Sequence, residues 1–369
     1  MSEIVKIALS GGPCGGKTTA LKYLSEHLKP YGVEVICVYE QATALMNMGF
    51  SPEKNGSYGF HRQLFENQLS EERKAEKRAQ VSSAKKALIL CDRGLLDSRA
   101  YVTGEEFSKY SALYGFCEDS LRNRYDAVFH LVTAADGAEK DYSAKTNSVR
   151  SEDAELARKL DSDILALWVG TQHLRIIDNS SGFENKLKHL LRETLAVLGI
   201  PEPLEIERKF LIDFPDIDHL NDMKHCRRIP ITQAYMETPE EGIFRVRRRG
   251  EGKGALYIKT VKRKINDMKR VETETIISEK EYNDYLSRKD HIEGIISKDR
   301  YCIAWKGSYY ELDVYPFWTD KATLEIELLS ETQPYILPDF IKLIREVTTE
   351  KQYRNKVLAV TYAKFFNRG

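Results

Sequence analysis

The stretch Glu205-Ile206-Glu207-Arg208-Lys209 introduces the pattern of the second half of the chain, because two like charges stand two positions apart with an apolar residue between them. Side chains alternate between the two faces of a β-strand, so charges at positions i and i+2 share one face, about 6 to 7 Å apart. Five more like-charged pairs follow along the chain: Arg245/Arg247, Glu272/Glu274, Lys298/Arg300, Glu311/Asp313 and Glu325/Glu327. The pattern predicts strands that each carry one charged face.

The alternate positions of these strands are often apolar, as Ile206, Val246 and Leu312 show. The charged faces could be the solvated surface of an open sheet, or they could line an enclosed space. Burial of an ion is costly unless the ion is paired, hydrated or metal-bound. Acidic and basic pairs both occur, and carboxylates suit hard divalent metals whereas Arg and Lys suit phosphate oxygens. We therefore favour a cavity that holds a metal-bound polyphosphate.

The composition allows two domains in 369 residues, each with its own core. We expect domains at 1–199 and 200–369, because Gly199-Ile200-Pro201-Glu202-Pro203 breaks a helical pattern before strand-like alternation begins. The 56 basic and 56 acidic residues balance, so nucleic acid is not indicated as a partner. Scattered cysteines, no signal-peptide profile and no apolar run of ~20 residues predict a cytoplasmic protein without a transmembrane segment. The sequence predicts no oligomeric state.

The first half opens with a phosphate-binding motif. Residues Ile4 to Leu9 are mostly apolar and predict a strand, and a helical stretch runs to about Leu28. The segment between them matches G-x-x-x-x-G-K-[ST], whose backbone N–H groups surround phosphate oxygens. We expect Lys17 to reach the β and γ phosphates and the Thr18 hydroxyl to bind Mg²⁺. The expected nucleotide-binding residues of this motif are Gly11, Gly12, Pro13, Cys14, Gly15, Gly16, Lys17, Thr18 and Thr19.

Strand and helix patterns alternate through the rest of this half, which predicts an α/β P-loop NTPase domain: a parallel sheet with helices on both faces. Ligands of such sheets lie beyond the carboxyl ends of the strands. The further expected strands are 33–39, 87–91, 127–132 and 174–177, and the expected helices are 58–86, 105–116, 152–170 and 183–198.

Four residues outside the motif are candidates for chemistry in this domain. Asp92-Arg93-Gly94 resembles the Asp-Arg tripeptide of nucleoside and nucleotide kinases, which implies that Asp92 orients Mg²⁺ or its water and that Arg93 faces phosphates. Glu40 follows the second strand, where such kinases often carry a carboxylate that activates the acceptor. Arg150 is a candidate for a mobile arginine over the γ phosphate. The alternatives are a helix cap for Asp92, a solvated loop acid for Glu40 and a surface salt bridge for Arg150.

The second half resembles the CYTH, or triphosphate tunnel metalloenzyme, superfamily through the E-x-E-x-K stretch at Glu205 and the later charge pairs in order. The resemblance implies an eight-stranded antiparallel β-barrel, in an α+β domain, that binds a triphosphate with Mg²⁺ or Mn²⁺. The residues implied for phosphate are Lys209, Arg245, Arg247, Lys262, Lys298 and Arg300. Those expected for metal are Glu205, Glu207, Glu272, Glu274, Glu311, Asp313, Glu325 and Glu327, of which Glu205 and Glu207 are also expected to be catalytic. The first half resembles the P-loop ATPase family that is found fused to CYTH domains.

Three functions remain open at this point. The first is a metal-dependent triphosphohydrolase fused to an ATP- or GTP-binding domain with hydrolase or kinase activity. The second is a nucleotide switch whose barrel only captures a phosphorylated ligand. The third is cyclase chemistry of the class IV adenylyl cyclase type. Intact acidic pairs favour chemistry over capture, because anion binding alone needs only the basic set.

Overall fold

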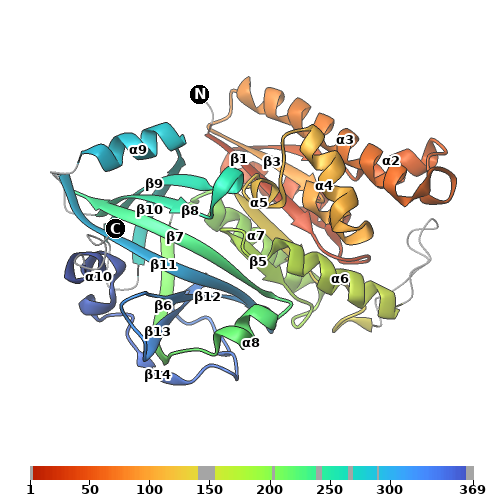
Figure 1. The fold of residues 1–369 in the computed structure, drawn as a ribbon. Helices are drawn as coiled ribbons and strands as arrows, with labels where there is room; N and C mark the ends of the chain where they lie inside the picture. Colours follow the sequence, from red (N-terminus) through yellow and green to blue (C-terminus); the bar gives the residue numbers. More distant parts are fainter. Residues whose placement is uncertain are drawn as a thin grey trace. The chain divides into compact units, whose positions relative to one another are not determined.

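The computed structural model describes residues 3–139, 154–201, 204–237, 243–264, 269–288 and 291–362. The chain divides into two compact units, Met1–Ile200 and Pro201–Gly369, which are coloured from red to green and from green to blue in Figure 1. Each unit is built around one sheet. None of the described helices combines the length and the apolar character that a membrane span requires.

The first unit contains a five-stranded parallel sheet in the order β2-β3-β1-β4-β5. Each strand coincides with one expected from the sequence. Their bounds are β1 (Glu3–Ser10), β2 (Val33–Val38), β3 (Lys86–Asp92), β4 (Ala127–Leu131) and β5 (Leu174–Ile177). The predicted parallel α/β fold class is therefore confirmed.

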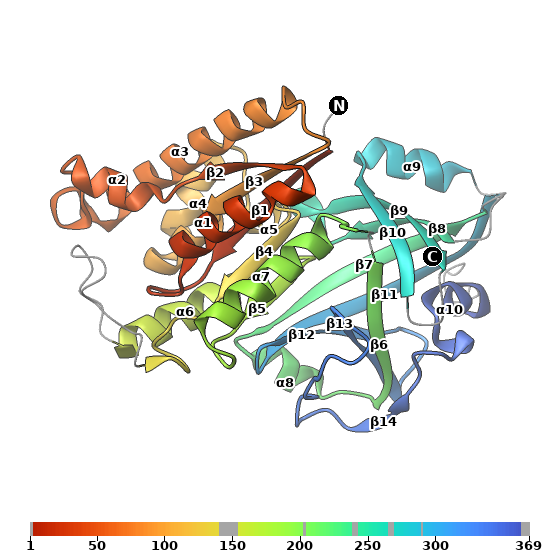
Figure 2. The ribbon, with the colours of Figure 1, turned by 180° about the vertical axis from the view of Figure 1, so that it is seen from behind.

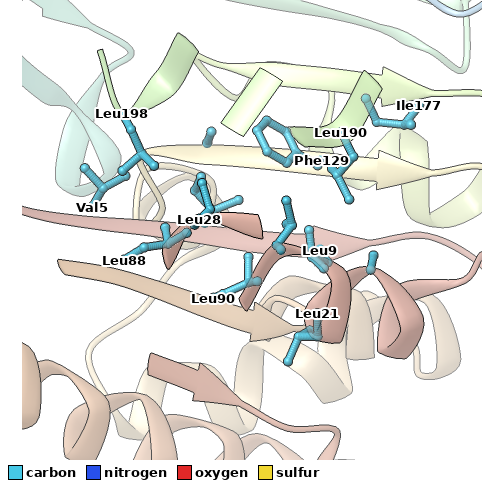
Figure 3. Close-up of a cluster of buried hydrophobic side chains, with 14 of the residues drawn as sticks. Val5, Leu9, Leu21, Leu28, Leu88, Leu90, Phe129, Ile177, Leu190 and Leu198 are labelled. Atoms are coloured by element: carbon cyan, nitrogen blue, oxygen red, sulfur yellow. The ribbon is translucent and has the colours of Figure 1, made fainter. Parts of the chain in front are cut away.

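Helices cover both faces of this sheet. They are α1 (Lys17–His27), α2 (Gln41–Asn47), α3 (Pro52–Gln80), α4 (Gly104–Leu113), α5 (Glu118–Arg122), α6 (Ala154–Trp168) and α7 (Phe183–Val197), with the short 3₁₀ segments η1 (Lys29–Tyr31) and η2 (Leu95–Tyr101). Figure 2 shows α1 and α7 together on one face, and Figure 3 shows their leucines packed with those of β1 and β3. On the opposite face, Lys6 of β1 contacts Glu72 of α3, and His130 of β4 contacts Asp161 of α6.

The helix α3 starts earlier than predicted and ends six residues sooner. Pro52 stands in its first turn, where proline is well tolerated, and Gly56 interrupts its regular geometry with a φ of 71°. Pro52 and Gly56 weaken the helical pattern in the sequence before residue 58, which explains why the predicted helix began only there.

The second unit contains an antiparallel sheet in the order β10-β9-β8-β7-β11-β12-β13-β6-β14. Pairing of β10 with β6 closes eight of these strands into the predicted barrel, and β14 adds to the same edge of β6 further along that strand. The strands are β6 (Leu204–Asp213), β7 (Cys226–Met236), β8 (Ile243–Arg249), β9 (Leu256–Lys264), β10 (Lys269–Ile276), β11 (Ile292–Trp305), β12 (Ser308–Val314), β13 (Lys321–Leu328) and β14 (Leu343–Glu346).

The apolar faces of the barrel strands point outward. Ile206, Leu312 and Leu324 form a buried cluster together with Leu220 of α8 (Ile217–Asp222). A second cluster joins Ala234 and other barrel residues to α9 (Glu279–Ser287), which packs on β8 and β9. The charged residues that alternate with these positions therefore lie on the inward face, because successive side chains of a strand point to opposite sides. The enclosed arrangement is confirmed, and the open sheet is excluded.

Apolar packing also occurs further along the inward faces. Leu211, Tyr235 and Tyr315 each stand two positions after an inward-facing charged or polar residue and therefore share its face. They pack against Leu358 of α10 (Asn355–Thr361). Helix α10 contacts β11 and β7. The charged part of the barrel interior is therefore bounded by an aromatic and aliphatic cluster under α10.

Candidate functional site

The loop from Gly11 to Gly16 has a backbone that requires glycine. Gly11 and Gly16 have φ values of 125° and 86°, in the region that favours glycine. A Cβ atom at Gly11 would lie 2.2 Å from the carbonyl oxygen of Leu131, and one at Gly15 would lie 2.5 Å from the same atom. The close approach of β4 thus holds the loop in the folded shape that presents backbone N–H groups to an anion.

Lys17 and Thr18 begin helix α1 directly after this loop. The ammonium group of Lys17 donates hydrogen bonds to the carbonyl oxygens of Gly11 and Gly12, at 2.8 and 2.7 Å. The hydroxyl of Thr18 donates to Oδ2 of Asp92 at the end of β3, at 3.1 Å. The structure thus brings together the lysine, hydroxyl and carboxylate that the sequence singled out.

Asp92 is buried, and burial raises its pKa, although the positive charge of Lys17 acts in the opposite direction. The negative charge of Glu40 also raises this pKa. A carboxylate with a raised pKa gains when a cation binds beside it, because the cation stabilises the ionised form. The pair of Thr18 and Asp92 is therefore a chemically suitable place for a hard divalent cation.

Arg93 and Glu40 face each other beyond β3 and β2. Nε of Arg93 lies 3.4 Å from Oε1 of Glu40, and Nη1 lies 3.4 Å from Oδ2 of Asp97 and 3.5 Å from the carbonyl oxygen of Gly11. Arg93 has a φ of 81°, which is unusual for a residue with a side chain and is typical of functional sites. Asp97 was not predicted from the sequence, yet it also accepts hydrogen bonds from Ser10 and Trp168 at 2.7 and 2.6 Å.

Asp161 of α6 fixes the phosphate loop from the other side. Its Oδ1 accepts hydrogen bonds from the backbone N–H groups of Gly12 and Thr133, at 2.6 and 3.2 Å. Its Oδ2 lies 3.1 Å from Nε2 of His130. Burial raises the pKa of Asp161, but the charge and hydrogen bond of His130 and the N–H of Gly12 outweigh burial and leave it below its ordinary value.

In the barrel, Arg300 of β11 is the centre of a buried ion-pair network. It donates to both carboxylate oxygens of Asp313 at 2.7 Å and to Glu325 at 2.8 Å, and it also pairs with Glu311. Lys209 pairs with Glu325 at 2.8 Å. These charges stabilise one another, because the carboxylates raise the pKa of Arg300 and the neighbouring cations keep that of Glu325 well below its ordinary value despite burial.

Lys298 belongs to the same network and is fully enclosed. It pairs with Asp313, and its ammonium nitrogen lies 3.4 Å from Oδ1 of Asn355 at the start of α10. Burial lowers the pKa of Lys298 to about 8, and the positive charge of Arg300 contributes in the same direction. Burial therefore disfavours the charged form of Lys298, and Asp313 and Glu325 act in the opposite direction.

The opposite wall of the barrel carries Arg245 and Arg247 on β8. Their Nη2 atoms lie 3.6 and 3.1 Å from Oε1 of Glu274, which also accepts a hydrogen bond from Thr260 at 3.0 Å. Lys262 is buried on the neighbouring strand β9. Glu274 therefore faces both arginines of this wall.

Arg249 is an inward-facing cation that the sequence analysis overlooked. It continues the alternation of Arg245 and Arg247 along β8 and is 4% exposed. Its Nη2 lies 3.9 Å from Sγ of Cys302. Extension of the i, i+2 rule by one step would have found it.

The carboxylates differ in their surroundings. The strand register places Glu207 opposite Glu327 and Glu311 opposite Glu325. Among the residues that the structure describes, no group of three or more His, Cys, Asp and Glu side chains is arranged to hold a metal ion. The side chains of Glu205 and Glu272 and the whole of Arg150 lie outside the described part of the chain. The metal and catalytic roles of the site residues stay predictions.

Fold and geometry define the class of protein: a P-loop nucleotide-binding unit followed by an antiparallel barrel whose interior carries charges of both signs. The family model described as an AAA domain matches residues 6–186, and the model of the CYTH domain matches residues 203–362. The chain belongs to the CYTH family, with an AAA-type P-loop domain preceding its CYTH domain. The fusion expected from the motifs is thus confirmed.

Individual proteins are similar to part of this chain. The inorganic triphosphatase of Nitrosomonas europaea is 32% identical over 163 residues, which cover 42% of this chain and 97% of that protein. A crystal structure of an inorganic triphosphatase is 30% identical with a TM-score of 0.29, covering 42% of this chain and 94% of the other. A protein from Pyrococcus horikoshii is 21% identical with a TM-score of 0.27, covering 33% of this chain and 77% of its own.

Proposed function

We propose that the barrel binds a linear triphosphate together with Mg²⁺ or Mn²⁺ and hydrolyses it, and that the P-loop unit binds ATP or GTP and hydrolyses or transfers its γ phosphate. The observation that carries the first part is the inward face of the closed barrel, where Lys209, Arg245, Arg247, Lys262, Lys298 and Arg300 are all buried. Enclosed cations need anionic partners, which carboxylates of the barrel supply at Arg300 and Lys209, and the oxygens of a triphosphate are suited to join them. The described similarity to an inorganic triphosphatase supports hydrolysis as the reaction.

The donor set of the barrel fits a divalent metal at one particular place. Glu207 and Glu327 stand opposite each other on neighbouring strands, and like charges in such positions repel. A hard cation with oxygen ligands relieves this repulsion. We therefore assign this opposed pair of carboxylates to the metal.

The chemistry in the barrel consists mainly of positioning and charge stabilisation. A bound divalent metal would neutralise phosphate charge and polarise the phosphoryl group. Arg245, Arg247 and Lys262 on one wall and Lys298 on the other would fix the oxygens of the phosphate chain. They would also stabilise the charge on the leaving phosphate as the terminal bond breaks. Enclosure in the barrel strengthens each of these interactions, because the local dielectric is low.

The P-loop unit has its own support. Lys17, Thr18 and Asp92 come together at the carboxyl end of the parallel sheet, directly beside the backbone of the glycine loop. This combination serves phosphate and Mg²⁺ binding in nucleotide-binding proteins. Glu40 and Arg93 lie next to this group. The carboxylate of Glu40 is suited to activate water or an acceptor, and the guanidinium group of Arg93 is suited to bind phosphate.

Phosphate release tests the division of labour between the units. Tripolyphosphate, ATP and GTP are each supplied with Mg²⁺ or Mn²⁺ to the full-length protein, to Lys17→Ala and to the double variant Arg245→Ala/Arg247→Ala. We expect hydrolysis of tripolyphosphate to persist in Lys17→Ala and to fall by about 100-fold in the double variant. Arg228→Ala is the matched control, because Arg228 also lies in the barrel but its side chain is 52% exposed.

The remaining outcomes distinguish the other functions. Hydrolysis that vanishes in Lys17→Ala and persists in the barrel variant would contradict hydrolysis in the barrel. Nucleotide binding without turnover in any form would support a nucleotide switch whose barrel captures a phosphorylated ligand. A cyclic nucleotide with pyrophosphate among the products would establish cyclase chemistry.

A further inference from the structure

A buried polar stripe on helix α3 faces the carboxyl end of β3. His61, Gln68 and Glu72 are buried and lie seven and four residues apart, on one side of the helix. Gln68 donates a hydrogen bond to the carbonyl oxygen of Arg93 at 3.1 Å, and Glu72 pairs with Arg124 at 2.7 Å. Two of these three polar groups thus have structural partners that account for their burial.

His61 is the exception in this stripe. It is 6% exposed, and within the described part of the chain no group forms a hydrogen bond with its buried Nδ1 atom. A buried polar atom without a partner is unfavourable, because it has lost its hydrogen bonds to water. Burial lowers the pKa of His61 to about 4, and the positive charge of Arg93 adds to this effect. The imidazole is therefore neutral near pH 7 and offers a hydrogen bond without a charge.

The surroundings of His61 are aromatic. Its ring stacks on Tyr101 at the end of η2, with a centroid distance of 5.1 Å and an interplanar angle of 15°. Phe60 contacts the ring edge-on at 5.2 Å. Tyr101 interacts electrostatically with Arg93, so the stacked pair and the guanidinium belong to one neighbourhood.

Arg93 and Glu40 connect this neighbourhood to the phosphate loop. Arg93 contacts both Glu40 and the carbonyl oxygen of Gly11, at 3.4 and 3.5 Å, and Gly11 also accepts a hydrogen bond from Lys17. The contacts of the guanidinium group with Glu40, Asp97 and Gly11 are all at least 3.4 Å long. Such contacts are at the weak end of hydrogen bonding, so a ligand oxygen can compete with them.

We propose that Glu40, His61, Arg93 and Tyr101 form a phosphoryl-acceptor site for a small, uncharged, hydroxyl-rich compound, either a nucleoside or a simple polyol. This inference rests on the proposed nucleotide binding by the P-loop unit and makes that unit a phosphotransferase. Among these four residues Arg93 is the cation, and it already faces Glu40 and Asp97, so the group carries no excess of the positive charge that an acceptor with its own phosphate requires. The neutral imidazole and the aromatic rings suit an uncharged molecule.

The reaction is balanced with the nucleotide as the only co-substrate. An acceptor hydroxyl oxygen attacks the γ phosphorus, and the bond from that phosphorus to the bridging oxygen breaks. The hydroxyl proton passes to the carboxylate of Glu40, and a nucleoside diphosphate leaves. The product is a phosphate monoester, whose new charge Arg93 is placed to bind.

The test uses the full-length protein with Mg²⁺, ATP or GTP, and a panel of adenosine, guanosine, cytidine, uridine, ribose and glycerol. Phosphorus NMR and mass spectrometry detect the monoester, which separates transfer from phosphate release. We expect a monoester with at least one member of the panel, and none with Lys17→Ala. Glu40→Gln should lower the rate of monoester formation by about 100-fold. Glu26→Gln is the control, because Glu26 is an exposed glutamate.

His61→Phe keeps an aromatic ring and removes the unpaired nitrogen. We expect it to raise the KM for the acceptor by about 10-fold and to change kcat by less than about threefold, which a merely structural role would not do. Nucleotide binding without a monoester from any panel member overturns the inference and leaves the proposed nucleotide binding intact. Monoester formation by Glu40→Gln at the wild-type rate, or an unchanged KM for the acceptor in His61→Phe, also overturns the inference. Absence of nucleotide binding would overturn both.

Discussion

At the scale of single residues, buried carboxylates hold neighbouring groups in place in both proposed phosphate sites. Asp161 accepts hydrogen bonds from the N–H groups of Gly12 and Thr133 and contacts His130, so one side chain joins α6 to the phosphate loop and to the end of β4. In the barrel, Asp313 is fully buried and accepts two hydrogen bonds from Arg300. Each carboxylate orients a group that is proposed to contact phosphate.

Asp161→Ala is predicted to destabilise the first unit by about 2–3 kcal/mol, because it leaves two backbone N–H groups and His130 without their acceptor. The contribution of Asp161 depends on pH. Its pKa is lower in the folded protein than the ordinary 3.8, so the stabilisation is present above that pH and is lost as the pH falls further through the folded-state pKa.

Urea unfolding followed by hydrogen exchange in peptides of the first unit, at pH 7 and below pH 4, measures this effect. Asp163→Asn on the same helix is the control, since its side chain is 33% exposed, and we expect a change within about 0.5 kcal/mol. Equal stability of Asp161→Ala and the wild type at pH 7 would show that the hydrogen bonds of Asp161 do not stabilise the loop.

At the scale of elements, strand β13 places two glutamates with different roles two positions apart. Glu325 is buried and pairs with Lys209 and Arg300, whereas Glu327 is exposed and lies opposite Glu207. The sequence treats the two as equivalent members of one motif. Their difference arises from the register with β6 and β12, which the local pattern does not contain.

Glu325→Gln and Glu327→Gln are therefore predicted to affect different properties of the protein. Glu325→Gln should cost about 3 kcal/mol in stability, because it removes the partner of two buried cations. Glu327→Gln should leave the free energy of unfolding within about 0.5 kcal/mol of the wild-type value. It should lower metal-dependent hydrolysis of tripolyphosphate by about 100-fold. Chemical unfolding and phosphate release on the same samples test both. A loss of stability in Glu327→Gln with unchanged hydrolysis would contradict the assignment of Glu327 to the metal.

The glycine loop offers a second prediction at this scale. Gly11→Ala places a Cβ atom 2.2 Å from the carbonyl oxygen of Leu131 at a φ of 125°, so the loop must rearrange. We expect nucleotide affinity to fall by about 100-fold, or ~2.7 kcal/mol, in a titration followed by calorimetry. Gly59→Ala is the matched control, because its Cβ would meet only Asn55 at 3.9 Å within a helix. Equal affinities of the two variants would contradict the role of this backbone.

Much of each element could be predicted from local sequence. Five strands of the first sheet follow from apolar runs, and alternation along Arg245 and Arg247 correctly placed the charged face inside the barrel. Features that depend on distant contacts could not be predicted. Neither the pairing of β14 with β6 nor the contact of Asn355 with Lys298 has a local signal. His61 likewise resembles any helical histidine until its unpaired nitrogen is seen.

At the scale of the whole molecule, a chain with zero net charge contains two sets of groups that we propose for phosphate binding. One is the loop of backbone N–H groups around Lys17, and the other is the interior of the barrel. The two sites use different chemistry, since the first relies on glycine backbone and a helix start and the second on side chains of eight strands. Point variants in either unit can therefore separate their activities in the intact chain.

The most direct test of the central claim is a crystal structure of the full-length protein with tripolyphosphate and Mn²⁺, with anomalous scattering to locate the metal. We predict a triphosphate inside the barrel, with its oxygens on Arg245, Arg247 and Lys298, and an anomalous peak between Glu207 and Glu327. Density for triphosphate and Mn²⁺ only beside Lys17 and Thr18, with the barrel cations still paired as in the ligand-free chain, would contradict the account.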